Sequence, residues 1–185
     1  MNDEFSSVDP APPASKKEKS VQQLRQLLLN PDKPTFKRYR ALFSLRNINT
    51  SEAVLAVCDA LDTGSDLFRH EVAFVLGQME HPASVPALVK ALQDKTQHAM
   101  VRHEAAEALG SIASPEVTSA GSLAQHVAMC KRVLTKKILL SCWAQVMELL
   151  QQFRADSVVA VRESCDVACS MNEYWQKFNA GLHPD

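Results

Sequence analysis

A sustained excess of positive charge is lacking in this sequence. The chain has 20 Lys and Arg residues against 21 Asp and Glu residues, so that its net charge is −1. Proteins that bind nucleic acid or anionic membrane surfaces through general electrostatic attraction need an excess of basic residues. We therefore expect the chain to bind neither nucleic acid nor a membrane surface.

Paired cysteines are also lacking. The 5 cysteines are odd in number and none forms a C-x-x-C pair, which indicates reduced thiols rather than a disulfide framework. The N-terminus is acidic where a signal peptide would be basic, and Lys136 and Lys137 interrupt the most apolar late stretch. These features predict a cytoplasmic protein without a membrane span.

Glycine is scarce, with 5 residues in 185, and the chain contains no Gly-rich phosphate loop and no nucleophile elbow. Residues 1–19 combine prolines, serines and a lysine-rich run, a composition that indicates a flexible linker or tail. We expect a repeat domain over 20–175 and a short C-terminal tail over 176–185. Breaks at Asn30-Pro31-Asp32, Thr63-Gly64-Ser65, His81-Pro82 and Ser114-Pro115 separate the expected helices.

Four segments of the chain align on an arginine. The spacings between Arg38, Arg69, Arg102 and Arg162 are 69 − 38 = 31, 102 − 69 = 33 and 162 − 102 = 60 residues. No stretch alternates with the period of a strand. The sequence therefore predicts an all-α fold, a HEAT-like α-solenoid built from helical-hairpin repeats of 31–33 residues.

The interval of 60 residues has two explanations. A degenerate extra repeat around Lys131-Arg132 would divide it into two ordinary intervals. Alternatively, residues 117–145 are an insertion, and their removal leaves 60 − 29 = 31 residues. We favour the insertion, although part of it, Val127 to Trp143, has the apolar periodicity of a helix.

Two repeats carry the same Arg-His-Glu triplet beside an apolar helical stripe. The stripes consist of Phe68, Val72, Val75, Leu76 and Met79, and of Val101, Ala105, Ala108, Leu109 and Ile112. At about 100° per residue, His70 and His103 point away from the stripes, whereas Glu71 and Glu104 lie on their flanks. Both pairs are expected to face out of the core, either as a solvated polar face or as a functional site.

Imidazole and carboxylate groups together form a ligand set that suits iron or manganese. Neighbouring helices pack about 8–10 Å apart, whereas ligand atoms lie about 2.0–2.6 Å from a metal. One wall with two His-Glu pairs therefore needs a second wall of ligands that faces it.

Three other features have competing interpretations. Cys165 and Cys169 align with the buried positions of Val72 and Leu76, which favours core thiols over a thiolate metal site. The four aligned arginines are interpreted as a structural ladder rather than a phosphate site. Gly77 and Gly110 either leave room above the imidazoles or help to end their helices.

The sequence resembles the deoxyhypusine hydroxylase family. The likeness covers about residues 6–116 and 146–175, and includes the tail Val161-Arg162-Glu163-Ser164-Cys165 and the linker Val8-Asp9-Pro10-Ala11-Pro12-Pro13. Its most specific motifs are Gly64-Ser65-x-Leu67-Phe68-Arg69-His70-Glu71-Val72, continued by Val75-Leu76-Gly77-Gln78, and Met100-Val101-Arg102-His103-Glu104 through Glu107-Ala108-Leu109-Gly110.

The resemblance implies a HEAT-like protein with a non-haem di-iron site shared by two halves, which hydroxylates deoxyhypusine on translation initiation factor 5A. It implies that His70, Glu71, His103 and Glu104 are iron ligands. The likeness is to the C-terminal half alone, so we expect a half-length form that needs a missing N-terminal half or a second copy. A metal-free repeat scaffold that binds a protein partner is the alternative.

Overall fold

The structure, a computed structural model, describes residues 19–112 and 136–182. Within these ranges it consists of eight α-helices and two short 3-10 helices, and it contains no strand. The all-α prediction is therefore confirmed. In the same ranges, no helix combines the length and the apolarity that a membrane span requires.

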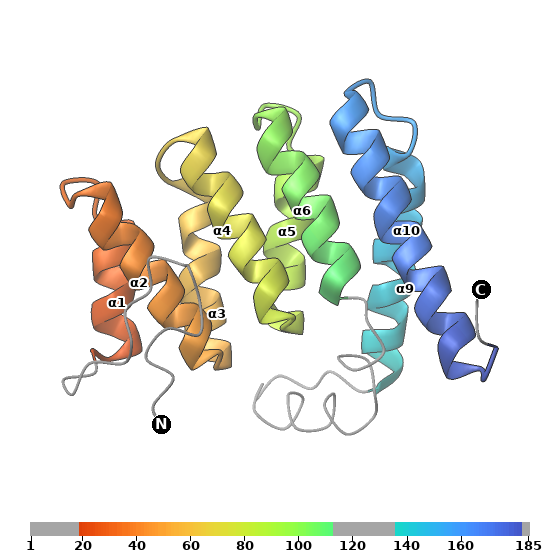
Figure 1. Ribbon diagram of the computed structural model, residues 1–185, viewed down its shortest axis with the longest axis horizontal. Helices are drawn as coiled ribbons and strands as arrows, with labels where there is room; N and C mark the ends of the chain where they lie inside the picture. The colour runs from red at the N-terminus through yellow and green to blue at the C-terminus, as the bar shows by residue number, and fades with distance from the viewer. Residues whose placement is uncertain (1–18, 113–135, 183–185) are drawn as a thin grey trace, which may run out of the picture.

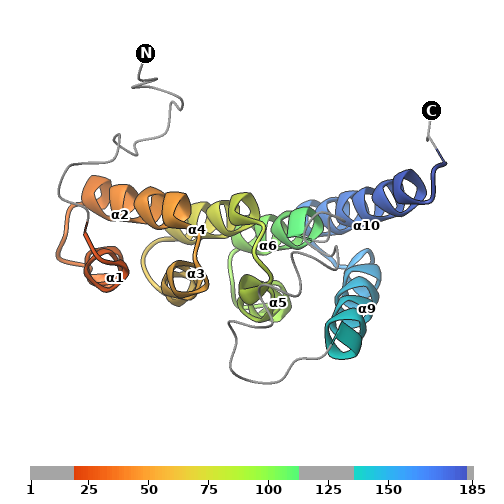
Figure 2. The same ribbon diagram turned by 90° about the horizontal axis from the view of Figure 1, so that it is seen from below.

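The helices form four hairpins that stack side by side (Figure 1). The helices α2, α4, α6 and α10 form one layer and α1, α3, α5 and α9 form the other, as Figure 2 shows, which is the arrangement of an α-solenoid. The hairpins are α1 (Val21–Leu29) with α2 (Thr35–Ile48), α3 (Ser51–Cys58) with α4 (Asp66–Met79), α5 (Val85–Gln93) with α6 (Ala99–Ile112), and α9 (Lys136–Phe153) with α10 (Val159–Asn179). The 3-10 helices are η1 (Asp59–Asp62) and η2 (Pro82–Ser84).

Local capping chemistry sets the ends of the helices. Ser20 and Gln23 form a capping box at α1, and Ser65 accepts a hydrogen bond from the Phe68 amide at the start of α4. The predicted breaks at 30–32, 63–65 and 81–82 are confirmed, whereas Ser114-Pro115 lies outside the described residues. A further break falls between α2 and α3, where Asn49 adopts a left-handed conformation with φ 45°.

The two predicted apolar stripes form the core between the layers. All ten of their side chains are buried, and the helices α4 and α6 pack directly against each other. Cys165 and Cys169 are buried in the same core, and burial raises the pKa of the Cys165 thiol to about 12. This confirms the interpretation of both cysteines as core thiols.

Two of the aligned arginines, Arg38 and Arg102, tie their hairpins together. Nε of Arg38 donates a hydrogen bond to the Leu28 carbonyl at 2.9 Å, and Nε of Arg102 donates one to the Leu92 carbonyl at 3.0 Å. In both repeats the acceptor is the carbonyl ten residues before the arginine, at the end of the preceding helix, where carbonyls lack intrahelical partners. Arg38 and Arg102 therefore satisfy the helix ends before them, which supports the predicted structural role of these two residues. Arg69 instead donates a hydrogen bond to the Gly64 carbonyl at 2.8 Å.

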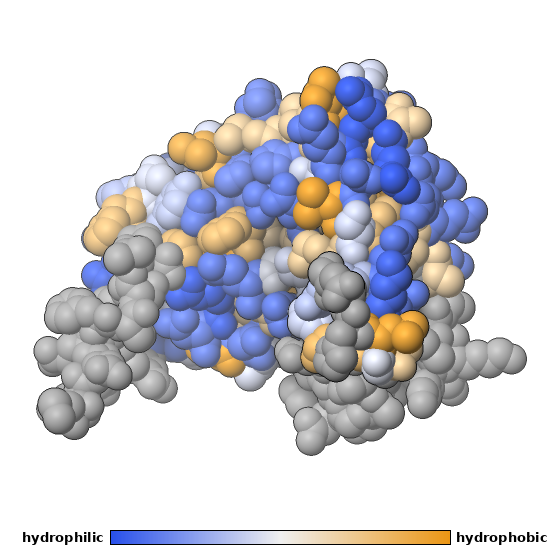
Figure 3. All heavy atoms as spheres, turned by 45° about the vertical axis from the view of Figure 1, so that its right-hand side comes forward, coloured by the Kyte–Doolittle hydropathy of each residue, from blue (hydrophilic) through white to orange (hydrophobic). Residues whose placement is uncertain are grey.

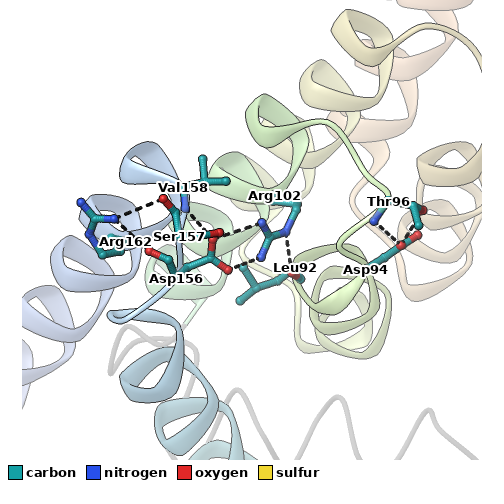
Figure 4. A network of polar contacts seen from close by, with 8 residues as sticks. All are labelled: Leu92, Asp94, Thr96, Arg102, Asp156, Ser157, Val158 and Arg162. Atoms are coloured by element: carbon teal, nitrogen blue, oxygen red, sulfur yellow. Dashed lines mark hydrogen bonds and ion pairs between the residues drawn. The ribbon is translucent and has the colours of Figure 1, made fainter.

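Asp156 joins the last two repeats (Figure 4). Nη2 of Arg102 lies 2.6 Å from Oδ2 of Asp156, and both side chains are almost fully buried, at 4% and 5% exposure. The backbone carbonyl of Asp156 accepts a hydrogen bond from Nη1 of Arg162 at 2.9 Å. The Asp156 side chain also accepts one from the Val158 amide at the start of α10. The final hairpin is thus fastened to α6 by a buried ion pair.

The final hairpin stacks as the next unit of the solenoid. Helix α10 packs directly against α6, so that in the described part of the chain no further repeat lies between them. This agrees with an insertion in the 60-residue interval. Of the expected insertion 117–145, residues 136–145 form the first part of α9, while residues 117–135, and with them most of the Val127–Trp143 helix, lie outside the described residues.

The C-terminal boundary of the helical region lies later than we expected. Helix α10 continues to Asn179, beyond residue 175, and its last turns carry mutual ring contacts of Tyr174, Trp175 and Phe178. The two contacts of Phe178, with Tyr174 and Trp175, lie at spacings of four and three residues, which face each other on a helix. The outer edge of the last hairpin is mostly hydrophilic with scattered apolar patches (Figure 3).

Gly77 and Gly110 permit close contact between neighbouring helices, which differs from both roles that the sequence suggested. A Cβ atom on Gly77 would lie 3.1 Å from Cα of Ala108, and one on Gly110 would lie 2.9 Å from Cα of Ala168. Each glycine therefore sits against an alanine of the next repeat. The shared register shows that α10 follows α6 as α6 follows α4.

We expect Gly110→Ala to lower the free energy of unfolding. The added methyl group meets the backbone of α10 and cannot be accommodated by a side-chain rotation, and overpacking of this kind costs about 1–3 kcal/mol. The higher helix propensity of alanine offsets about 1 kcal/mol of this cost. Urea unfolding measures the free energy of unfolding of Gly110→Ala, and of Gly77→Ala, relative to the parent chain. A Gly110→Ala chain more stable than the parent would contradict the close contact.

Candidate metal centre

The two predicted histidines lie next to each other on the exposed side of the α4–α6 layer. His70 of α4 and His103 of α6 occupy the same position in their repeats, and their ring centroids are 5.5 Å apart. Both side chains are half-buried, at 24% and 26% exposure. Stacking of two repeats in register thus places two imidazoles side by side.

Glu104 completes a group of three ligand-type side chains. Nε2 of His70 lies 3.2 Å from Oε2 of Glu104, and one ligand atom each from His70, His103 and Glu104 lies within 4.8 Å of the other two. Two ligands at about 2.0–2.3 Å from one metal are at most about 4–4.6 Å apart. Small side-chain rotations therefore suffice to bring these three atoms onto one ion.

Glu104 is more buried than we expected, at 7% exposure, whereas the phase of its helix predicted an outward-facing side chain. Helix α6 is flanked by α4 and α10, and the His70 side chain reaches across from α4 to contact Glu104. Coverage by a neighbouring repeat is invisible to the phase of a single helix. The Glu104 side chain is therefore covered by a neighbouring repeat, although it lies on the flank of its own apolar stripe as expected.

Unbalanced charge surrounds Glu104. Burial, followed by the nearby charges of Glu107 and Glu71, raises the pKa of the Glu104 carboxyl to about 7. Burial and the neighbouring His103 hold the pKa of His70 below its usual value, which favours the neutral imidazole that binds metals. Nδ1 of His70 is buried and has no hydrogen-bond partner among the described residues. A bound cation would relieve this carboxylate repulsion.

Glu71 is the predicted residue that the structure leaves out of this group. It follows His70 on α4, and its charge raises the pKa of both Tyr39 and Glu104. It therefore lies close enough to the site to act on it electrostatically. The structure thus brings together three of the four predicted residues and places the fourth at their edge.

Two further residues contact His103 and were not predicted from the sequence. Oγ of Ser164, on α10, lies 3.4 Å from Nδ1 of His103 and donates a hydrogen bond to Oε1 of Glu107 at 2.9 Å. Oε1 of Glu107 is 3.5 Å from Nδ1 of His103. The position of Glu107, one helical turn after His103, was the available sequence indication. Nothing within its own repeat marks Ser164.

The chain is similar to proteins with helical repeats and to one group of enzymes. A family model described as HEAT repeats matches residues 21–94 and 56–125. Deoxyhypusine hydroxylase of Danio rerio is 44% identical over 170 residues, and that of Bos taurus is 46% identical over 170 residues. Each alignment covers 92% of this chain and 46% of the relative. The predicted resemblance is confirmed.

A solved structure of human deoxyhypusine hydroxylase in complex with glycerol is similar in both sequence and fold. It is 44% identical, with a TM-score of 0.70, and the match covers 92% of this chain and 48% of the human chain. The predicted HEAT-like solenoid is confirmed by this match. The chain spans about half the length of the relatives that it matches.

Proposed function

The chain belongs to the HEAT-repeat family, and from this premise we propose that it is one half of a deoxyhypusine hydroxylase that binds iron. The observation that carries the proposal is the convergence of His70, His103 and Glu104 within 4.8 Å. Mixed imidazole and carboxylate ligands suit iron. The reduced thiols of the described cysteines agree with a cytoplasmic enzyme.

The residues of the site divide into ligands and a charged surround. His70, His103 and Glu104 would bind one iron ion, and Glu71 would supply a further carboxylate at its edge. The raised pKa of Glu104 fits such an ion, because a cation would offset the cost of a buried carboxylate close to Glu107 and Glu71. Bound iron would supply the activation of O2 that hydroxylation of a C–H bond requires.

Carboxylates at the site fit the proposed substrate. The deoxyhypusine side chain of translation initiation factor 5A ends in a cationic 4-aminobutyl group, and Glu71 and Glu107 contribute negative charge beside the site. Opposite charge favours the approach and orientation of such a side chain. In the proposed reaction one oxygen atom of O2 enters the C–H bond, and the other leaves as water after taking up two protons from solvent and two electrons from an external reductant.

The site is open on the side away from the core, so that a second wall is needed to enclose a side chain. We propose that this wall is an N-terminal half corresponding to the unmatched length of the relatives, or a second copy of this chain in a symmetric dimer. Either would place similar ligands opposite His70 and His103. The chain alone would then bind iron weakly and turn over slowly.

Hydroxylation of the deoxyhypusine form of factor 5A, followed by mass spectrometry with Fe2+, O2 and a reductant, tests this function. We expect iron-dependent gain of one oxygen atom, with specific activity that rises with chain concentration or on addition of the complementary half of the human relative. His103→Ala should abolish the gain. No product in either arm would contradict the proposed activity, and full turnover by a monomer would contradict the need for a second wall.

A further inference from the structure

The His103 ring is held from the side opposite His70 by two residues of different helices. Ser164 comes from α10 and is buried at 5% exposure, whereas Glu107 comes from α6 and its side chain is 46% exposed. The Ser164 hydroxyl donates to the Glu107 carboxylate at 2.9 Å, which fixes an otherwise mobile side chain. Both groups then lie beside Nδ1 of His103, at 3.4 and 3.5 Å.

The repeat register explains why a serine is found there. His70 of α4 faces Glu104 of the next repeat, and His103 of α6 faces Ser164 of the repeat that follows. Glu104 and Ser164 both lie two residues after the aligned arginine of their repeats. The last repeat therefore presents a short, uncharged hydroxyl at the position where the preceding repeat presents a candidate ligand.

From this arrangement we infer that Ser164 and Glu107 are positioning residues, which hold Nδ1–H of His103 so that Nε2 is available to a metal. The inference rests on the proposed function, because it concerns the orientation of a proposed ligand. Metal-binding histidines generally donate their second ring N–H to a carboxylate or another acceptor, which fixes the tautomer and the ring orientation. The 3.5 Å contact is long, as such contacts often are before a ligand binds.

This assignment gives the final hairpin a part in the site. Helix α10 contributes none of the three grouped ligands, yet its Ser164 reaches Glu107 and His103 of α6. The register that brings Ser164 to this point depends on the close contact of Gly110 with Ala168. Correct stacking of the last hairpin should therefore matter for metal binding.

The variants Ser164→Ala and Glu107→Gln test the assignment, with Ser170→Ala and Glu163→Gln on the exposed surface of α10 as matched controls. Calorimetric titration with Co2+ measures metal affinity in each full-length chain. Loss of an outer partner of a ligating histidine typically lowers metal affinity about 10–100-fold. We expect a loss in this range for both test variants and less than about twofold change in the controls.

A second measurement tests the contact of His103 with Ser164 and Glu107 in the absence of metal. Long-range 1H–15N NMR spectra of the metal-free chain at pH 8 report the tautomer of the neutral His103 ring. We expect the Nδ1–H tautomer in the parent chain and a shift towards Nε2–H in both test variants, with circular dichroism unchanged. An unchanged tautomer in the variants would overturn the positioning role. A parent chain that binds no Co2+ would instead overturn the proposed function, and the tautomer would still decide the positioning role.

Discussion

Replacement of Arg102 by Ala should lower the free energy of unfolding by about 3–5 kcal/mol, because it leaves the buried Asp156 carboxylate without its partner. The Arg102 side chain also donates to the Leu92 carbonyl at the end of α5, so that its loss frees two acceptors at once. Urea unfolding monitored by circular dichroism measures the change. The two repeats that Arg102 connects include the one that carries Ser164.

An exposed ion pair in the final hairpin provides the control. Arg154 pairs with Asp166, and both side chains are about half exposed, so that Arg154→Ala should cost less than about 1 kcal/mol. A loss of similar size in the two variants would contradict the structural role of Arg102.

Acid unfolding should also show the contribution of the Arg102–Asp156 ion pair to stability. The hydrogen bond from Arg102 holds the pKa of Asp156 below its usual value. The stability that the pair contributes is therefore fully present above about pH 4, the pKa of an unfolded aspartate, and is lost as the pH falls through the lower pKa of the folded state. Arg102→Ala should remove this part of the pH dependence.

Replacement of His103 or His70 by Ala should reduce Fe2+ affinity by more than roughly 100-fold, the upper range for loss of an outer partner of a ligand. Helical circular dichroism should remain unchanged, because both rings lie at the surface of the layer rather than in its core. Anaerobic calorimetry with Fe2+ measures the affinity.

His98→Asn is a matched control for the histidine substitutions. Nδ1 of His98 accepts a hydrogen bond from the Met100 amide before the first turn of α6, and asparagine can supply the same cap. This variant should keep both the helix and the affinity. Equal loss of affinity in His98→Asn would show that the effect arises from disturbance of α6 rather than from a lost ligand.

The repeats and the core were predictable because both follow from regular spacings along the chain. The interval between Arg38, Arg69 and Arg102 set the repeat length, and the apolar stripes set the buried face. Arg38 and Arg102 proved structural because each satisfies a carbonyl at the end of the helix before it. The break after Asn49 was missed, although Asn followed by Thr matches a helix end and a new cap.

What the sequence could not supply is contact between repeats. The burial of Glu104 depends on α4, the role of Ser164 depends on α10, and the constraint on Gly110 depends on Ala168. Each depends on a contact with a residue of another helix, and the stacking of the hairpins determines how close the two residues lie. The sequence therefore placed His70 and His103 on one surface but did not show which carboxylate lies between them.

Iron K-edge X-ray absorption of the Fe2+-loaded chain tests the central claim most directly, namely that the α4–α6 wall binds iron through His70, His103 and Glu104. We expect scattering from two imidazoles and from carboxylate oxygen, with one imidazole lost in His103→Ala. Sulfur ligands, or a spectrum that His103→Ala leaves unchanged, would contradict the account.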